Sequence, residues 1–410
     1  MPKRLFICIL CLAVAIACFP VNAAEIDLSP TPPPEASAPE KLCPLSDIPL
    51  LEKPPFSIPC ASAMLVEMDS GQVIFSKDAD QQRPVASVVK VMTILLTLEM
   101  LESGRLTADT VVTVSEDAAG MGGSQVLLDV GEKQTIATLL KSTIVGSAND
   151  AAVALAEVMY GSEKICADQM NARALELGMM NTHFVNCTGL PADGQYTTAH
   201  DVAIMFREVV SHPLYFEYAG IWLDEVDHGD GRKTQLANTN KLIRLYDGCD
   251  GGKTGSTNEA GYCVAATAHR GDMRLIAVVL GADEGKKRFD AAAEMFDYGF
   301  ANYRRYPVAR KGTRIRGLLP VTGGTEEGVP LMLNGDLTLL VLKGTEQSIK
   351  LVPTLPESLP APVHSGQTVG HVSVDVEGRS VAEIPVITCG EVGARGLMPG
   401  LRRIIAHWTA

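Results

Sequence analysis

The sequence lacks the signatures of several large protein classes. Beyond its first 23 residues it has no Cys-x-x-Cys pair, which disfavours a cysteine-bound zinc site. Its eight histidines form no His-Glu-x-x-His pattern, which disfavours a metallopeptidase. Basic residues form no block and do not alternate with aromatic ones, and the formal net charge is −13. Nucleic acid is therefore not expected as a partner, and no metal or cofactor is expected.

Long apolar runs are also scarce, and the one that stands out lies at the N-terminus. Lys3 and Arg4 precede an apolar run over residues 5–19, which is short for a membrane span. Val21-Asn22-Ala23 then places small residues at the two positions that a signal peptidase reads. We interpret residues 1–23 as a signal peptide, which predicts an exported protein. An uncleaved anchor and lipidation at Cys18 are the alternatives.

Cysteines are few and scattered once residues 1–23 are set aside. Export permits disulfide bonds, but an odd number leaves at least one thiol free or paired between molecules. The sequence does not determine the pairing. The seven remaining cysteines are Cys43, Cys60, Cys166, Cys187, Cys249, Cys263 and Cys389.

Composition divides the rest of the chain into four segments. Residues 24–59 are a proline-rich leader, which is typical of an extended tether. Residues 60–305 mix helical and strand patterns. Residues 306–392 carry short Val, Leu and Ile alternations broken by Gly, Pro and Asn, which predicts a small all-β domain. Residues 393–410 form a C-terminal tail.

The C-terminal tail contains a short amphipathic pattern. Leu401, Ile404, Ile405 and Trp408 recur at helical spacing. A helix of this kind either lies in a membrane interface or packs against the β domain, and the sequence leaves both open.

Within residues 60–305, periodicity predicts strands at both ends and helices between them. Strands at both ends around a helical block indicate an α+β fold with an antiparallel sheet and a helical subdomain. The predicted elements are a hairpin over 63–77, helices over 87–101, 136–145, 150–160, 167–177 and 201–210, strands over 252–256, 261–269 and 273–280, and a helix over 289–303.

The first motif that carries chemistry is Ser87-Val88-Val89-Lys90. It opens an apolar helix, and residues three apart share one face of a helix. A lysine in a buried helix is costly unless it has a partner or a purpose. A serine hydroxyl needs a base before it can act as a nucleophile, and a lysine with a lowered pKa can serve. The alternative is an N-cap serine followed by a lysine that extends to solvent.

Two further motifs follow in order, Ser147-Ala148-Asn149 and Lys253-Thr254-Gly255. Ser147 and Asn149 are suited to proton relay and hydrogen bonding, although they are also ordinary caps before a helix. Lys253 and Thr254 on an edge strand can hold the carboxylate of an extended peptide, and Gly255 leaves room for its approach. Lys253 is also the candidate second cation that lowers the pKa of Lys90.

These three motifs together resemble those of penicillin-binding proteins, in particular the serine-type D-alanyl-D-alanine carboxypeptidases of low molecular mass. The likeness covers most of residues 60–305. It also includes Gly123-Ser124-Gln125, Asn149-Asp150-Ala151-Ala152, Asn186-Cys187-Thr188-Gly189-Leu190, Asn238-Thr239-Asn240-Lys241-Leu242 and Gly255-Ser256-Thr257. The resemblance implies a β-lactamase/transpeptidase-like catalytic domain followed by a small β domain.

The resemblance also implies a role for each site residue. Ser87 forms the acyl-enzyme, Lys90 is the general base, and Ser147 and Asn149 assist. Lys253, Thr254, Gly255 and Ser256 bind the substrate, and the backbone N–H groups of Ser87 and Ser256 form the oxyanion hole. Arg288 matches an arginine that helps to hold the terminal carboxylate.

The implied activity is removal of the terminal D-alanine from peptidoglycan stem peptides, without a cofactor and with β-lactams as inhibitors. The implied place is the outer face of the cytoplasmic membrane, the periplasm or the cell-wall space. A β-lactamase and a catalytically silent sensor on the same fold are the alternatives. The segment after Asn149 lacks a Glu-x-x-x-Asn pattern, which disfavours a β-lactamase. Every motif residue is intact, which disfavours a silent sensor.

Overall fold

The structure is a computed structural model that describes residues 42, 44–46, 50, 55–56, 58–376 and 378–396. The chain divides into two compact units. The first contains Pro34–Tyr306 and Leu339–Gly344, and the second contains Pro307–Thr338 and Thr345–Ala410. The predicted signal peptide, nearly all of the predicted leader and the predicted helix at 401–408 lie outside the described residues, and the predicted segment boundaries stay predictions.

The first unit is built on an antiparallel sheet with the strand order β2-β1-β9-β8-β7. Its strands are β1 (Ser62–Glu67), β2 (Val73–Lys77), β7 (Cys249–Thr257), β8 (Gly261–Arg270) and β9 (Met273–Ala282). The structure contains both the predicted N-terminal hairpin and the predicted three-strand meander. They join into one sheet because β1 pairs with β9, so that Met64 lies opposite Val278.

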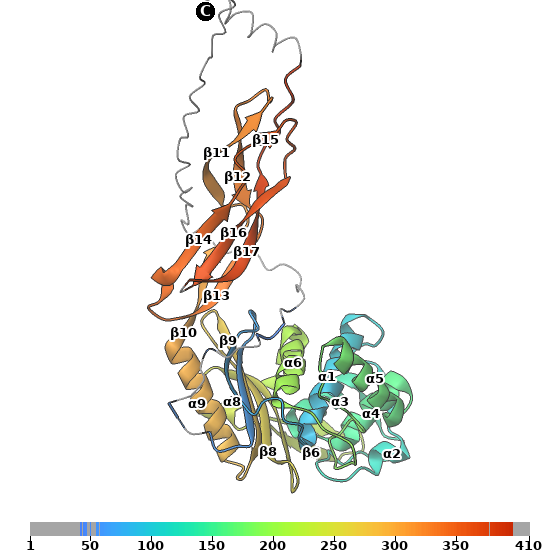
Figure 1. The fold of residues 1–410 in the computed structure, drawn as a ribbon. Coiled ribbons are helices and arrows are strands. Elements are labelled where there is room, and N and C mark those ends of the chain that lie inside the picture. The colour runs from blue at the N-terminus through green and yellow to red at the C-terminus, as the bar shows by residue number, and fades with distance from the viewer. Residues whose placement is uncertain are drawn as a thin grey trace, which may run out of the picture. The chain divides into compact units, whose positions relative to one another are not determined.

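Alternate residues of the central strands face two different cores, as a pleated strand requires. In β1, Ala63 and Leu65 belong to the core beneath α9 (Lys287–Asn302), whereas Met64 and Val66 belong to the core shared with the helical block. The sheet therefore lies between α9 on one face and α6 (Ala199–Ser211) on the other (Figure 1).

The helical block surrounds α1 (Lys90–Glu102), of which ten residues are buried. A helix that is apolar on nearly every face is stable only when other helices cover it. Several helices begin at a Ser or Thr whose side chain accepts a backbone N–H, as at Ser115, Thr135, Ser162 and Thr198. The other helical elements are η1 (Ala86–Val89), α2 (Glu116–Ala119), α3 (Ile136–Lys141), η2 (Ser142–Gly146), α4 (Asn149–Tyr160), α5 (Glu163–Glu176), α7 (Pro213–Ala219) and α8 (Leu242–Leu245).

Two short two-stranded sheets at the edge of this block were not predicted from the sequence. The first pairs β3 (Val111–Thr113) with β4 (Lys133–Thr135), and the second is the hairpin of β5 (Leu223–Asp227) and β6 (Lys233–Ala237). In this hairpin only Val226 and Leu236 are buried within the strands, so the alternation that normally reveals a strand is almost absent.

The second unit contains a six-stranded sheet with the order β14-β16-β17-β12-β11-β15. All its pairs are antiparallel except β11 with β15. This confirms the predicted fold class, an α+β domain followed by a small β domain. The strands from β10 onward are β10 (Tyr303–Ala309), β11 (Arg314–Thr322), β12 (Gly328–Leu333), β13 (Leu337–Leu342), β14 (Ile349–Thr354), β15 (Leu359–Pro360), β16 (Thr368–Val376) and β17 (Arg379–Thr388), with a short helical turn η3 (Glu346–Ser348).

Among the residues that the structure describes, none of the helices combines the length and the apolar character that crossing a membrane requires.

Candidate active site

Ser87, Lys90 and Asn149 meet at the N-terminal end of α1. The Lys90 ammonium donates hydrogen bonds to Ser87 Oγ at 3.0 Å, to Asn149 Oδ1 at 2.5 Å and to the carbonyl of Thr188 at 2.6 Å. Lys90 is fully buried. The structure therefore places the Ser87 hydroxyl in direct contact with the Lys90 amine. The Asn149 amide oxygen and the Thr188 carbonyl hold that amine in place.

The backbone before α1 explains how Ser87 and Lys90 come to face each other. η1 precedes α1, and its first residue, Ala86, has a φ of +49°. The residue that caps η1 is Val85, with no side-chain hydrogen bond, so Ser87 is not the N-cap that the simpler interpretation required. Because Ser87 and Lys90 lie one helical turn apart, their side chains point the same way.

Ser147 and Lys253 form a second contact. Lys253 Nζ donates to Ser147 Oγ at 2.7 Å and to the carbonyl of Thr254 at 2.9 Å. Ser147 ends η2 with a left-handed backbone, at a φ of +61°, and the N-cap of α4 is Ala148, so Ser147 is not an ordinary cap before a helix. Lys253 is only 1% exposed, which excludes the interpretation of a solvated lysine at the start of a strand.

Burial lowers the pKa of both lysines. The pKa of Lys90 falls to about 7, mainly through desolvation, while Cys187, Asp150 and Glu163 act in the opposite direction. The pKa of Lys253 lies well below its ordinary value, first through burial and then through the charge of Lys90. We expected both burial and the charge of Lys253 to lower the pKa of Lys90. Burial is the leading cause, as expected, but the influence of one lysine on the other falls on Lys253.

The amide of Asn149 is fixed by the loop over residues 122–128. Its Nδ2 donates to the carbonyl of Gly122 at 2.6 Å, which leaves Oδ1 to face Lys90. Asn149 N–H also donates to the carbonyl of Ser124. The buried carboxylate of Asp150 accepts hydrogen bonds from the N–H groups of Val126 and Leu128. Asn149 and Asp150 therefore tie this loop to the start of α4.

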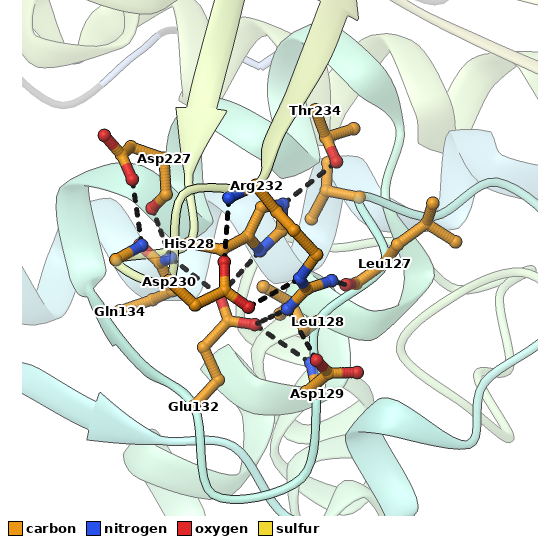
Figure 2. A network of polar contacts seen from close by, with 12 residues as sticks. Leu127, Leu128, Asp129, Glu132, Gln134, Asp227, His228, Asp230, Arg232 and Thr234 are labelled. Carbon is orange, nitrogen blue, oxygen red and sulfur yellow. Dashed lines mark hydrogen bonds and ion pairs between the residues drawn. The ribbon is translucent and has the colours of Figure 1, made fainter.

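A partly buried ionic network joins residues 129–134, which follow this loop, to the β5–β6 hairpin (Figure 2). His228 Nδ1 lies 2.8 Å from Glu132 Oε1, and His228 Nε2 lies 2.9 Å from Thr234 Oγ1. Arg232 contacts Glu132 at 3.4 Å and also contacts Asp129. Burial alone would raise the pKa of Glu132, but hydrogen bonds from the Asp129 N–H, Gln134 and His228 outweigh it and lower that pKa.

Glu132→Gln is expected to lower the melting temperature at pH 7 by roughly 4–8 °C, because it removes charge-assisted hydrogen bonds worth about 2 kcal/mol. A carboxyl whose pKa is lowered in the folded state stabilises above its unfolded-state pKa and loses that contribution as pH falls. The difference between parent and variant should therefore shrink below the ordinary value of 4.5. Thermal unfolding of parent and variant at several pH values measures this difference in melting temperature. The exposed Glu259 supplies the control, Glu259→Gln, and an equal loss in both variants would contradict the network's role.

The structure shows a second reason for a glycine at residue 255, beside its predicted role in substrate approach, which stays a prediction. β7 is the edge strand of the sheet, as predicted. A Cβ on Gly255 would lie 2.5 Å from the carbonyl oxygen of Val85 and 2.9 Å from the N–H nitrogen of Ser87. Gly255 is therefore needed for the approach of β7 to the backbone that carries the nucleophile. Ser256, the next residue, is exposed and Thr254 is buried.

Arg288 begins the last helix of the first unit and reaches back to β7. Its guanidinium donates to the carbonyls of Gly255 at 3.0 Å and Cys263 at 3.2 Å, and it stacks over Tyr262 and Phe289. Burial lowers its pKa. The structure thus brings Arg288 to the same strand as Lys253, and its predicted contact with a carboxylate stays a prediction.

No role was predicted for the segment around Thr188, although this segment was part of the resemblance. Its carbonyl accepts from Lys90, and the preceding Cys187 donates from its N–H and its thiol to Glu163 Oε1. Cys187 also accepts a hydrogen bond from Thr93 through its carbonyl. Backbone acceptors have no side-chain signature, so the signal available in the sequence was the glycine at 189, which has a positive φ in the structure.

Comparison with known proteins agrees with this geometry. A family model described as D-alanyl-D-alanine carboxypeptidase matches residues 50–284, and one described as penicillin-binding protein 5, C-terminal domain, matches residues 303–394. The D-alanyl-D-alanine carboxypeptidase DacF of Bacillus subtilis is 36% identical over 349 residues, which cover 85% of this chain and 90% of that protein. DacD of Escherichia coli is 31% identical, with coverage of 88% and 94%.

Solved structures show the same fold. Penicillin-binding protein 5 from Haemophilus influenzae superposes with a TM-score of 0.73 at 29% identity, covering 83% of this chain and 99% of that one. Penicillin-binding protein 6B from Escherichia coli gives a TM-score of 0.68 at 28% identity, covering 83% and 99%. These matches, together with the contacts of Ser87, Lys90 and Lys253, confirm the predicted family: the chain belongs to the D-alanyl-D-alanine carboxypeptidases, a family of serine peptidases.

Proposed function

We propose that this chain is a serine D-Ala-D-Ala carboxypeptidase that removes the terminal D-alanine from peptidoglycan stem pentapeptides through an acyl-enzyme on Ser87. The observation that carries the proposal is the buried contact of Lys90 Nζ with Ser87 Oγ at 3.0 Å. A lysine with a pKa of about 7 is partly uncharged at neutral pH, so it can accept the serine proton.

In the proposed reaction, Ser87 Oγ attacks the carbonyl carbon of the scissile peptide bond and its proton passes to Lys90 Nζ. The backbone N–H groups of Ser87 and Ser256 would stabilise the oxyanion, and this pairing is supported by the close approach of β7 to η1. Ser147, which accepts a hydrogen bond from Lys253, would relay to the leaving amine the proton that Lys90 took from Ser87, as the scissile C–N bond breaks. Water then hydrolyses the ester and frees Ser87.

The terminal carboxylate of the substrate is the proposed partner of Lys253, Thr254 and Arg288. The positive charge on Lys253 is unfavourable in the free enzyme because burial and Lys90 lower its pKa. A bound carboxylate would reverse this, since an opposite charge at close range favours the ammonium form. Binding of substrate and charging of Lys253 would therefore support each other. β-Lactams would acylate Ser87 by the same attack and act as inhibitors.

The proposed place of action follows from the signal peptide pattern. Export would bring the protein to the outer face of the cytoplasmic membrane, the periplasm or the cell-wall space, where peptidoglycan is located. The amphipathic spacing from Leu401 to Trp408 would provide a contact with the membrane surface.

The test is release of D-alanine from a diacetyl-lysyl-D-alanyl-D-alanine peptide by the purified protein and by Ser87→Ala. The native protein is expected to release D-alanine and to be labelled by fluorescent penicillin, whereas Ser87→Ala should do neither. Labelling of Ser87→Ala would overturn the assignment of the nucleophile. Penicillin labelling without D-alanine release would indicate a sensor, and fast turnover of nitrocefin would indicate a β-lactamase.

The rate of acylation by penicillin is expected to rise with pH and to level off above about pH 7. Lys90 must lose its proton before it can accept one, and its pKa lies at about 7. At pH 5.5 the rate should be about 30-fold below the plateau, since each pH unit below the pKa lowers the uncharged fraction about tenfold. The acylation rate constant, measured with fluorescent penicillin at several pH values between 5 and 9, tests this expectation. A flat profile would argue against Lys90 as the base.

A further inference from the structure

A second cluster of ionisable side chains lies at the opposite end of α1 from Lys90. Glu99 and Glu102 lie in the last turn of α1, Glu208 lies in the last turn of α6, and His212 follows α6. One carboxylate oxygen from each of Glu99 and Glu208 and one ring nitrogen of His212 all lie within 4.8 Å of one another. At a rise of about 1.5 Å per residue, Glu99 and Glu102 lie roughly 13–18 Å along α1 from Lys90, so the cluster is separate from the active site.

His212 is the unusual member of this cluster. It is only 8% exposed, and neither ring nitrogen makes a hydrogen bond of acceptable geometry. Nδ1 does approach Glu102 Oε2 at 2.8 Å. Buried polar groups normally have partners, so a buried imidazole in this state is costly. A carboxylate beside one ring nitrogen is also the arrangement that orients a histidine whose other nitrogen binds a metal.

The charges around His212 favour a cation. Arg173 contacts Glu99 at 2.8 Å, Glu208 at 3.3 Å and Glu176 at 3.1 Å. Its contacts with Glu99 and Glu208 use Oε1 of each carboxylate, which leaves Oε2 of each for another ligand. Counting Glu102, four carboxylates share this region with two guanidinium groups, that of Arg173 and that of Arg207, which lines the same cavity and donates to the carbonyl of Met68. The described cluster therefore carries an excess of negative charge that a divalent cation would offset.

We propose that Glu99, Glu208 and His212 bind a zinc ion, with Glu102 holding the imidazole. Imidazole and carboxylate ligands suit Zn²⁺, and a tetrahedral zinc ion needs ligand atoms about 3.4 Å apart. Small side-chain movements reach that spacing from the separations present. A cavity of about 910 Å³, lined among others by Glu102, Glu208 and His212, gives the ion access. The fourth position would be taken by water.

Such an ion would connect α1, which carries Lys90 at its other end, to α6 beneath the sheet, so its role would be structural. The sequence predicted no metal because it lacks the short motifs that place ligands close together in the chain. Here the ligands come from two helices more than a hundred residues apart in sequence.

The test is calorimetric titration of the purified protein with ZnCl₂, beside thermal unfolding with and without the metal. One equivalent should bind, and zinc at a hundredfold excess over its dissociation constant should raise the melting temperature by roughly 5 °C or more. His212→Gln and Glu208→Gln should each weaken binding at least tenfold. His183→Gln replaces an exposed histidine outside the cluster and should bind zinc like the parent. MgCl₂ should give no comparable shift.

Absence of zinc binding by the parent would overturn the proposal, and so would binding that both cluster variants retain. If His212→Gln does not fold, the test uses Glu208→Gln instead. Co²⁺ then replaces zinc as the probe, because its absorption spectrum reports the geometry of its ligands. A tetrahedral Co²⁺ spectrum in the parent that is lost in Glu208→Gln would support the site, and an octahedral spectrum of unchanged intensity would contradict it.

Discussion

Replacing Lys90 by methionine is expected to slow acylation of Ser87 by penicillin about 10³-fold at pH 8, and to remove its dependence on pH. Methionine fills a similar volume but cannot accept the proton that Lys90 Nζ is placed to take from Ser87 Oγ at 3.0 Å. The variant should still fold. The loss of the ammonium leaves the acceptors Asn149 Oδ1 and Thr188 O unpaired, which is destabilising, but removal of a buried charge offsets this cost. The second-order rate of labelling by fluorescent penicillin measures the effect.

Lys286→Met is the matched control for this experiment. The Lys286 side chain is 85% exposed and approaches only Asp290, at 3.8 Å. Its replacement should leave the acylation rate within about twofold of the parent, since isolated surface ion pairs contribute little. If Lys90→Met acylates Ser87 within tenfold of the parent at pH 8, another group must take the proton.

Gly189→Ala is expected to reduce acylation at least about 100-fold and to destabilise the protein by about 3 kcal/mol or more. A Cβ at Gly189 would lie 2.0 Å from the carbonyl oxygen of Ala86 and 2.9 Å from the Ser87 nitrogen. These are backbone atoms, so the segment that carries the nucleophile must move. The same change displaces the neighbouring Thr188 carbonyl, which accepts from Lys90. Denaturant unfolding and penicillin labelling measure the two effects.

Gly194→Ala separates this clash from the cost of backbone conformation. Gly194 has a φ of +82°, close to the +78° of Gly189, but nothing lies within 4 Å of the position of its Cβ. Both variants bear the cost of about 1–2 kcal/mol for a left-handed alanine, and only Gly189→Ala bears the clash. Comparable losses of acylation in both variants would show that the approach of residue 189 to Ala86 is unimportant.

The sequence predicted the side chains of the site well, because their chemistry is visible in residue type and order. Ser87, Lys90, Ser147, Asn149 and Lys253 lie together in the structure. The apolar character of α1 on nearly every face correctly indicated that Lys90 is buried. The hairpin and the meander were also predictable, since their strands alternate clearly and end at turn residues.

What the sequence could not supply is mostly backbone geometry. The carbonyl of Thr188 has no pattern that marks it as an acceptor for a lysine. The left-handed Ser147 follows a π-helical turn, which residue preferences do not predict. α5 begins at Glu163 after its cap Ser162, earlier than expected, because most of its first residues are polar and hide its period. Only Val226 and Leu236 are buried within the strands of the β5–β6 hairpin, so hydrophobic alternation missed it.

The pairing of β1 with β9 has a consequence for the order in which the molecule can assemble. Met64 meets Val278, and the residues that separate them include the nucleophile, its base and the whole helical block. The central sheet cannot close until the chain has been synthesised through Ala282, and contacts so distant in sequence form slowly. A nascent or truncated chain ending before β9 would hold every residue of the three motifs and still have no platform on which to align them.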